Sequence, residues 1–222
     1  EFTANVSHEL KTPLTTISGY AQMISNGMAK TEDIKEFGRK IEKESDRLLT
    51  LIDDIINLSN IDEQGSIENP ENIDLSLVTE EAICVLEKAA KERGIQIYYT
   101  KIPTFIKGNV TLVSELVYNL LDNAIKYNKD NGKIAVFVGE SAKGVELSVK
   151  DTGIGIPPED TERIFERFYR VDKSHSKKVG GTGLGLSIVK HVCACHNATI
   201  RVKSKVGKGT TIYVTFPNNV NN

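Results

Sequence analysis

The chain has 222 residues, of which 39% are hydrophobic and 26% are charged, which is enough for one large or two small domains with ordinary cores. A formal net charge of −2 gives no reason to expect nucleic-acid binding, and no apolar run is long enough to span a bilayer or to serve as a signal peptide. Three cysteines (Cys84, Cys193 and Cys195) have spacings that suit no zinc site, which favours a reducing, cytosolic compartment.

Apolar residues spaced by three and four predict that the chain opens with an amphipathic helix; they are Leu10, Leu14, Ile17, Ala21, Ile24 and Met28. At about 100° per residue, His8 points away from this stripe to solvent, and Thr12, four residues on, shares its face. Glu9 is adjacent, and a carboxylate that accepts the proton of one imidazole nitrogen leaves the other free to attack. Taken alone, His8 could also be an ordinary surface histidine.

A second helix is predicted to begin near Thr31, after a short break, and to form an antiparallel hairpin with the first. Its apolar seam keeps the same spacing with one polar member, Glu44, and comprises Ile34, Phe37, Ile41, Glu44, Leu48, Leu51, Ile55 and Leu58. One hairpin cannot cover this seam together with Leu49, Ile52 and Ile56. We therefore expect residues 1–62 to form a homodimeric four-helix bundle.

A polar, turn-rich stretch over 62–70 predicts a domain boundary, giving domains 1–66 and 67–222. Helices are expected over 76–93, 109–127 and 184–196. Strands are expected near residues 73 and 105, over 95–99, 133–139 and 144–151, and in a closing hairpin over 198–206 and 210–216. This order predicts an α+β chain whose second domain is an α/β sandwich with a mixed sheet.

The helix over 109–127 places Asn119, Asn123 and Lys126 at i, i+4 and i+7, on one face. Two amide oxygens and an ammonium suit a magnesium-bound polyphosphate, since Mg²⁺ prefers oxygen ligands and lysine supplies a point charge for phosphate. A polar helix face in water is the alternative.

Two glycine-rich segments follow. Asp151 ends an apolar strand and could accept a hydrogen bond from an exocyclic amine such as that of adenine, while Gly153 and Gly155 allow the backbone to approach a flat ring. The run Gly180–Leu186 enters a helix and would present backbone amides to anions. The polar, basic stretch over 171–179 before it, with Lys173, His175, Lys177 and Lys178, is interpreted as a mobile lid.

Five motifs in order resemble those of the sensor histidine kinases of two-component systems, and the resemblance covers essentially the whole chain. They are Ser7–Leu14, the helix with two asparagines, Asp151–Gly155, Phe165–Arg170 and Gly181–Gly185. The resemblance implies a dimerisation and phosphoacceptor domain. An ATP-binding domain of the kind shared with gyrase and the large heat-shock chaperone would follow it.

The resemblance also implies a role for each matching residue. His8 would accept phosphoryl, Glu9 would orient or deprotonate it, and Thr12 would position water for dephosphorylation of a response regulator. Asn119 and Asn123 would hold Mg²⁺. ATP would be bound by Asn119, Asn123, Lys126, Tyr127, Asp151, Gly153, Gly155, Arg170, Gly181, Thr182, Gly183, Leu184, Gly185 and Thr211.

Two positions depart from the pattern: Glu115 stands where many relatives have Gln, and Asn197 stands where relatives often have Gly. The implied partners are a second copy of the chain and the receiver domain of a response regulator. The chain is expected to be the cytoplasmic portion of a membrane-anchored sensor whose sensory segments lie upstream, since it begins within a helix and without Met.

Three other functions stay open. A nucleotide-dependent clamp or chaperone ATPase would leave His8 and the helical seam without a role. A non-catalytic docking module would leave Asn123, Asp151 and the glycine loop unexplained. Finally, phosphatase activity could dominate over kinase activity, and the sequence does not rank the two.

Overall fold

The computed structural model describes the chain except for residues 1, 64–66, 68, 172–180 and 219–222. It divides into two compact units, Glu1–Ser59 and Asn60–Asn222. The predicted boundary between residues 66 and 67 falls a few residues after this division, next to residues outside the described part. Within the described residues, no helix combines the length and apolar character needed to cross a membrane.

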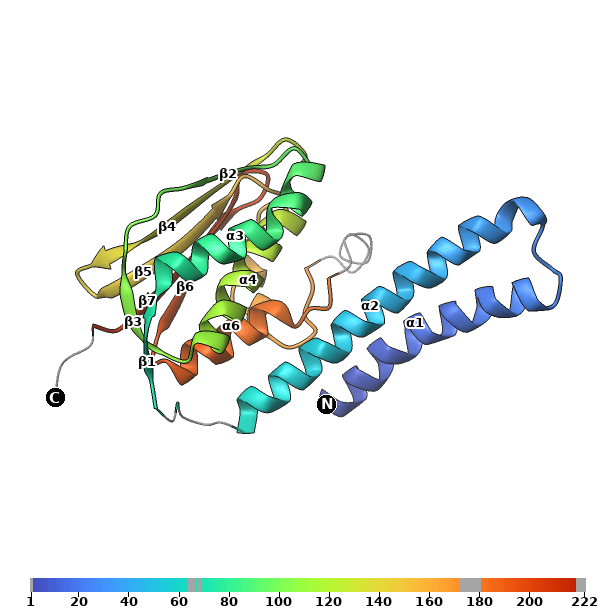
Figure 1. The fold of residues 1–222 in the computed structure, drawn as a ribbon, viewed down its shortest axis with the longest axis horizontal. Coiled ribbons are helices and arrows are strands. Elements are labelled where there is room, and N and C mark those ends of the chain that lie inside the picture. Colours follow the sequence, from blue (N-terminus) through green and yellow to red (C-terminus); the bar gives the residue numbers. More distant parts are fainter. Residues whose placement is uncertain (1, 64–66, 68, 172–180, 219–222) are drawn as a thin grey trace. The chain divides into compact units, whose positions relative to one another are not determined.

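The first unit is the predicted helical hairpin, formed by α1 (Phe2–Ser25) and α2 (Thr31–Glu63) (Figure 1). The helices meet through side chains such as Tyr20 and Phe37, whose ring centroids lie 5.0 Å apart. The side chains of Leu49, Ile52 and Ile56 remain 60%, 38% and 51% exposed, as expected if one hairpin cannot cover both apolar faces of α2.

The second unit alternates strands and helices close to the predicted positions. Its strands are β1 (Glu71–Asp74), β2 (Gln96–Tyr99), β3 (Phe105–Gly108), β4 (Lys133–Ser141), β5 (Gly144–Asp151), β6 (Thr199–Lys205) and β7 (Gly209–Phe216). Its helices are α3 (Leu75–Glu92), α4 (Val110–Lys126) and α6 (Gly185–Cys195), with short 3₁₀ turns η1 (Pro158–Asp160) and η2 (Arg163–Phe165).

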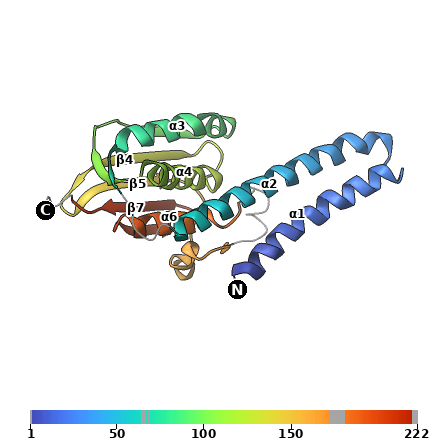
Figure 2. The ribbon, with the colours of Figure 1, turned by 60° about the horizontal axis from the view of Figure 1, so that its bottom comes forward.

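The mixed sheet has the order β2-β4-β5-β7-β6, in which β2 and β4 are parallel and the other neighbours antiparallel. One face carries α3, α4 and α6, which makes a two-layer sandwich (Figure 2). Alternate residues of β5 and β7, such as Leu147 and Val214, are fully buried, as are Leu116 and Leu121 of α4, which lies on this face of the sheet (Figure 2). The first and third strands, β1 and β3, form a separate antiparallel pair that the sequence did not predict.

Side-chain caps fix where two helices begin. Asp74 Oδ1 accepts hydrogen bonds from the backbone N–H groups of Ser76 and Leu77 and starts α3, and Asn109 Oδ1 accepts from Leu112 N at 3.1 Å and starts α4. Asn197, after α6, has a φ of 51°, the left-handed conformation expected for a residue that replaces glycine there.

Candidate functional site

His8 lies on the exposed face of α1, as its helical position predicts. The hydroxyl of Thr12 donates a hydrogen bond to the backbone carbonyl of His8 at 3.1 Å, so the two residues share that face one turn apart. The imidazole is therefore accessible to a reactant from solvent.

Glu9 points toward α2 and forms an ion pair with Arg47, whose Nη2 lies 3.5 Å from Glu9 Oε2. Arg47 Nη1 also lies 3.7 Å from Oε2 of Glu44, the one polar member of the α2 seam. The polar residue Glu44 is thus accommodated in the apolar seam of α2 because it pairs with Arg47, which also pairs with Glu9, the residue next to His8. This contact fixes Glu9 between the two helices.

The amide face of α4 is arranged as expected. Asn119 Nδ2 donates to the carbonyl of Glu115 at 2.9 Å, and Asn123 Nδ2 donates to the carbonyl of Asn119 at 2.7 Å. Both side chains thereby direct their Oδ1 atoms away from the helix backbone. A Cβ on Gly185 would lie 2.6 Å from Asn119 Oδ1 and 3.3 Å from Asn123 Nδ2, so the start of α6 lies directly against this face.

The glycine loop is supported by the segment that follows η2 and continues to Arg170. Phe168 N donates to the carbonyl of Gly183 at 2.8 Å, and Arg170 Nη2 donates to the carbonyl of Thr182 at 2.8 Å. Gly183 has a φ of 79° and would place a Cβ 2.9 Å from Phe168 Cα, so only glycine fits. The motifs at Phe165–Arg170 and Gly181–Gly185 therefore form one structure.

Asp151 ends β5, and its Oδ1 accepts two backbone hydrogen bonds, from Gly153 N at 2.7 Å and Thr210 N at 3.2 Å. Burial raises the pKa of the Asp151 carboxyl above its ordinary value, although these two N–H groups oppose the shift. Gly153 packs against the end of α4, where a Cβ would lie 2.2 Å from Tyr127 O.

Gly155 adopts the left-handed conformation with a φ of 71° and approaches β6 closely, since a Cβ would lie 2.2 Å from Lys205 O. The neighbouring backbone is held by Gly207 N, which donates to Ile154 O at 2.7 Å. The Asp151 loop is thereby fixed between α4 and the β6–β7 turn.

The structure brings the neighbour of Thr211, and not Thr211 itself, into contact with Asp151, so the assignment of Thr211 to the nucleotide site stays a prediction. Thr211 pairs with Lys150 and lies on the sheet face away from the helices, whereas Thr210 faces inward, is 8% exposed and contacts Asp151. The signal was available, because Ile212, Val214 and Phe216 alternate as the buried set and assign 210 to their face.

Three further candidate residues make contacts within the domain, and their assignment to ATP stays a prediction. Lys126 Nζ forms an ion pair with Asp122 at 2.7 Å, on α4 itself. Tyr127 contacts the Asp151 loop through its backbone, since its carbonyl accepts from Ile154 N at 3.1 Å. Leu184 is fully buried, so its side chain belongs to the core and only its backbone could meet a ligand.

The donors present suit a magnesium–nucleotide complex better than a bare ion. Within the described residues, no three or more His, Cys, Asp or Glu side chains cluster as a metal site. The amide oxygens of Asn119 and Asn123 are hard but uncharged ligands, which fits Mg²⁺ that keeps waters and phosphate oxygens in its shell. The lid predicted over 171–179 falls almost entirely on residues outside the described part.

Two supporting residues were missed by the sequence reasoning. Arg93, after α3, donates to carbonyls at the end of α4, and the buried Asn128 joins that turn to β4 and to Thr152. No local sequence pattern signals the contacts of Arg93 with α4 and of Asn128 with Thr152, because each joins residues more than 20 positions apart.

Two family models match the chain. Residues 108–220 match the "Histidine kinase-, DNA gyrase B-, and HSP90-like ATPase" family, and residues 1–64 match the "His Kinase A (phospho-acceptor) domain". The sensor-like histidine kinase SenX3 of Mycobacterium tuberculosis (strain ATCC 25618 / H37Rv) is 38% identical over 219 residues, which cover 98% of this chain and 53% of SenX3. The chain thus spans about half the length of such curated relatives.

Solved structures share the fold. The Acinetobacter baumannii histidine kinase AdeS is 25% identical with a TM-score of 0.74, over 96% of this chain and 98% of that one. Histidine kinase ThkA, in complex with response regulator protein TrrA, is 24% identical with a TM-score of 0.77, over 99% of this chain and 61% of that one. With a phosphoacceptor domain and an ATPase domain in the order of the five motifs, the chain belongs to the sensor histidine kinases of two-component systems.

Proposed function

We propose that this chain transfers the γ-phosphoryl group of ATP to His8 and then to an aspartate on the receiver domain of a response regulator. In the first step a ring nitrogen of His8 forms a bond to the γ-phosphorus as the bond to the β–γ bridging oxygen breaks, and ADP leaves with the electron pair. The observation that carries the proposal is an exposed His8 beside the fixed carboxylate of Glu9. The other unit of the chain brings together an amide face, a glycine loop and a half-buried Asp151.

The nucleotide would lie with its base at Asp151 and its phosphates at the amide face. Asp151 Oδ1 is occupied by two backbone N–H groups, and we assign Oδ2 to the amino group of adenine. Asn119 and Asn123 would hold Mg²⁺, which supplies charge neutralisation at the phosphates when bound. The turn at Gly183, with the N-terminus of α6, would offer backbone N–H groups to phosphate oxygens.

Glu9 would accept the His8 proton, directly or through water, because it is the next residue on α1 and its ion pair with Arg47 holds its carboxylate in place. Thr12 lies one turn away on the exposed face of the same helix. This placement favours a second activity, in which the Thr12 hydroxyl positions water for attack on the phosphorylated aspartate of the regulator.

We propose a homodimer through α1 and α2 as the working form. The exposed apolar residues Leu49, Ile52 and Ile56 would be covered by the same helices of a second copy. The regulator would dock on the hairpin near His8, where the phosphoryl group would be carried; ThkA, which shares this fold, forms a complex with a response regulator. By its relation to sensor kinases, the chain would be the cytoplasmic portion of a membrane-anchored protein.

The test is incubation with Mg²⁺ and γ-labelled ATP, comparing the chain with His8→Gln. We expect acid-labile, alkali-stable label on the first and none on the second. Label that persists in His8→Gln would refute the assignment of the acceptor, and nucleotide binding without any label would favour the clamp ATPase.

For the second activity, Thr12→Ala is expected to keep autophosphorylation and to slow dephosphorylation of the regulator. An equal loss of both activities would count against the role of Thr12. The measurement is loss of label from phosphorylated regulator after ATP has been removed.

A further inference from the structure

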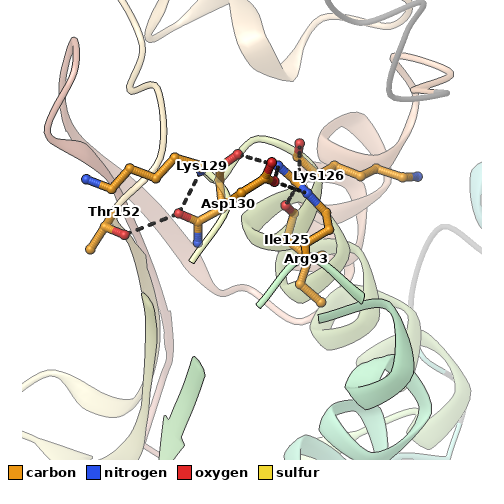
Figure 3. A network of polar contacts seen from close by, with 7 residues as sticks. Arg93, Ile125, Lys126, Lys129, Asp130 and Thr152 are labelled. Carbon is orange, nitrogen blue, oxygen red and sulfur yellow. Dashed lines mark hydrogen bonds and ion pairs between the residues drawn. The ribbon is translucent and has the colours of Figure 1, made fainter. Parts of the chain in front are cut away.

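The C-terminal end of α4 is hydrogen-bonded by Arg93, which lies at the end of α3. Arg93 follows α3, and its Nη1 donates to the carbonyls of Ile125 and Lys126 while its Nη2 donates to the carbonyl of Asn128 at 2.7 Å (Figure 3). Its Nε and Nη2 also reach Asp130 Oδ1, at 3.1 and 3.0 Å. The guanidinium thus holds the last turn of α4 and the turn after it in one geometry.

Asn128 carries this geometry onward to the sheet. Its side chain is buried, with 3% exposure. Its Nδ2 donates to Lys133 O at 3.2 Å, and its Oδ1 accepts from Lys129 N at 3.0 Å and from the Thr152 hydroxyl at 3.2 Å. A buried amide with these partners fixes the turn against the start of β4 and the end of β5.

Thr152 is the residue next to Asp151. Its hydroxyl oxygen also accepts from Lys133 N at 2.9 Å, and its own N–H donates to Lys133 O at 3.1 Å. Figure 3 shows Arg93 and Thr152 at the two ends of this network, with the turn after α4 between them. Arg93, Asn128 and Thr152 therefore help to set the position of the Asp151 loop relative to α4, together with the direct bond from Ile154 N to Tyr127 O.

We propose that Arg93 is a positioning residue for nucleotide binding, which acts through Asn128 and Thr152 to hold Asp151 at the correct place relative to the amides of α4. The proposal rests on the nucleotide site assigned above. Lysine cannot replace Arg93, because one ammonium with three donors cannot reproduce the five hydrogen bonds of the planar guanidinium. The contribution is geometric, since Arg93 is not assigned any contact with the nucleotide.

The experiment measures ADP affinity by calorimetry and the KM and kcat for ATP in autophosphorylation, at a temperature where every variant is folded by circular dichroism. Arg93→Lys is expected to weaken ADP binding about tenfold, the equivalent of one displaced hydrogen bond, and to raise KM by a similar factor. The kcat at saturating ATP should stay unchanged, because the attack by His8 does not involve this network. Arg201→Lys, an exposed arginine paired with Glu146 at 3.8 Å on the outer sheet face, is the matched control.

A double-mutant cycle tests the route. If Arg93 acts through Thr152, then Thr152→Val weakens ADP binding as well, and adding Arg93→Lys to it causes little further loss. Thr152→Ser, which keeps the hydroxyl, should restore affinity.

Three results would overturn the proposal: wild-type affinity in Arg93→Lys, losses that simply multiply in the double variant, or an equal fall of kcat with an unchanged KM. Failure of the wild-type chain to bind ADP at all would instead refute the assigned nucleotide site.

Discussion

Replacing Asp151 by Asn should lower the affinity for nucleotide without lowering the stability of the unliganded protein. The Asn side chain keeps an Oδ1 that can accept from Gly153 N and Thr210 N, at 2.7 and 3.2 Å in the parent chain. It replaces Oδ2 by an amino group, which would face the amino group of adenine, donor against donor. The lost hydrogen bond to a charged acceptor is worth about 1.5–3 kcal/mol. Nucleotide affinity should therefore fall about 10- to 150-fold.

The free energy of unfolding of the unliganded protein should not fall with the nucleotide affinity. Burial raises the folded pKa of Asp151 above the ordinary value of 3.8, so its protonated form is the one favoured by folding. The stability that this group contributes is present below pH 3.8 and is lost as the pH rises through the folded pKa. Above the folded pKa, the folded protein carries the desolvation cost of the ionised Asp151 carboxylate, and Asp151→Asn removes this cost. The free energy of unfolding without nucleotide should thus be equal or higher in the variant.

Calorimetric titration with ADP and urea unfolding at pH 7.5 measure the two effects. Glu146→Gln, on the outer face of the same strand, is the control and should change neither affinity nor stability appreciably. A variant that binds ADP as the parent does would refute the adenine assignment. A variant that binds weakly but is also clearly less stable would show that Asp151 acts mainly as a structural hydrogen-bond acceptor.

Three other predictions follow from buried groups. Gly153→Ala should lower stability by about 1–3 kcal/mol and weaken ADP binding, because its Cβ would lie 2.2 Å from a backbone carbonyl at the end of α4. Gly19→Ala, where a Cβ would meet open space, is the control and should do neither. Thermal unfolding of the two variants measures the difference in stability. Burial lowers the pKa of His196, so the stability gained from its neutral ring is present above pH 6.5 and is lost as the pH falls through the folded pKa. Urea unfolding should therefore give a lower free energy of unfolding at pH 5.0 than at pH 7.5. This difference should be smaller in His196→Gln. Burial raises the pKa of the Cys193 thiol to about 12, so iodoacetamide at pH 8 should modify the exposed Cys84 and spare Cys193 in peptide mass spectra; modification of both in the folded protein would contradict that burial.

Local patterns in the sequence predicted most elements and the helix or strand on which most candidate site residues lie. The three-and-four spacing of apolar residues predicts α1 and α2, and the exposure of His8 follows from the same period. The positions of Asn119 and Asn123 on one face of α4 are likewise a property of helix geometry, and a chain reversal at Gly207 is expected from residue type. These features depend on neighbours within one or two turns, so the sequence alone was sufficient.

Tertiary structure decided the features that depend on register and on distant partners. The backbone N–H of Thr210, and not that of Thr211, donates to Asp151 because the register of β7 against β5 decides which residue of β7 lies beside the end of β5. The same register turns the side chain of Thr210 toward the helices, and a shift of one residue would reverse the face. Arg93 looks like an ordinary charged residue at a helix end, and its bonds to Ile125, Lys126 and Asn128 arise only when α3 packs beside α4. The sequence by itself thus determined the helices, the strands and the motifs they carry. The packing of α3, α4 and the sheet determined how Asp151 is held, because the hydrogen bonds that hold it join residues that no local pattern connects.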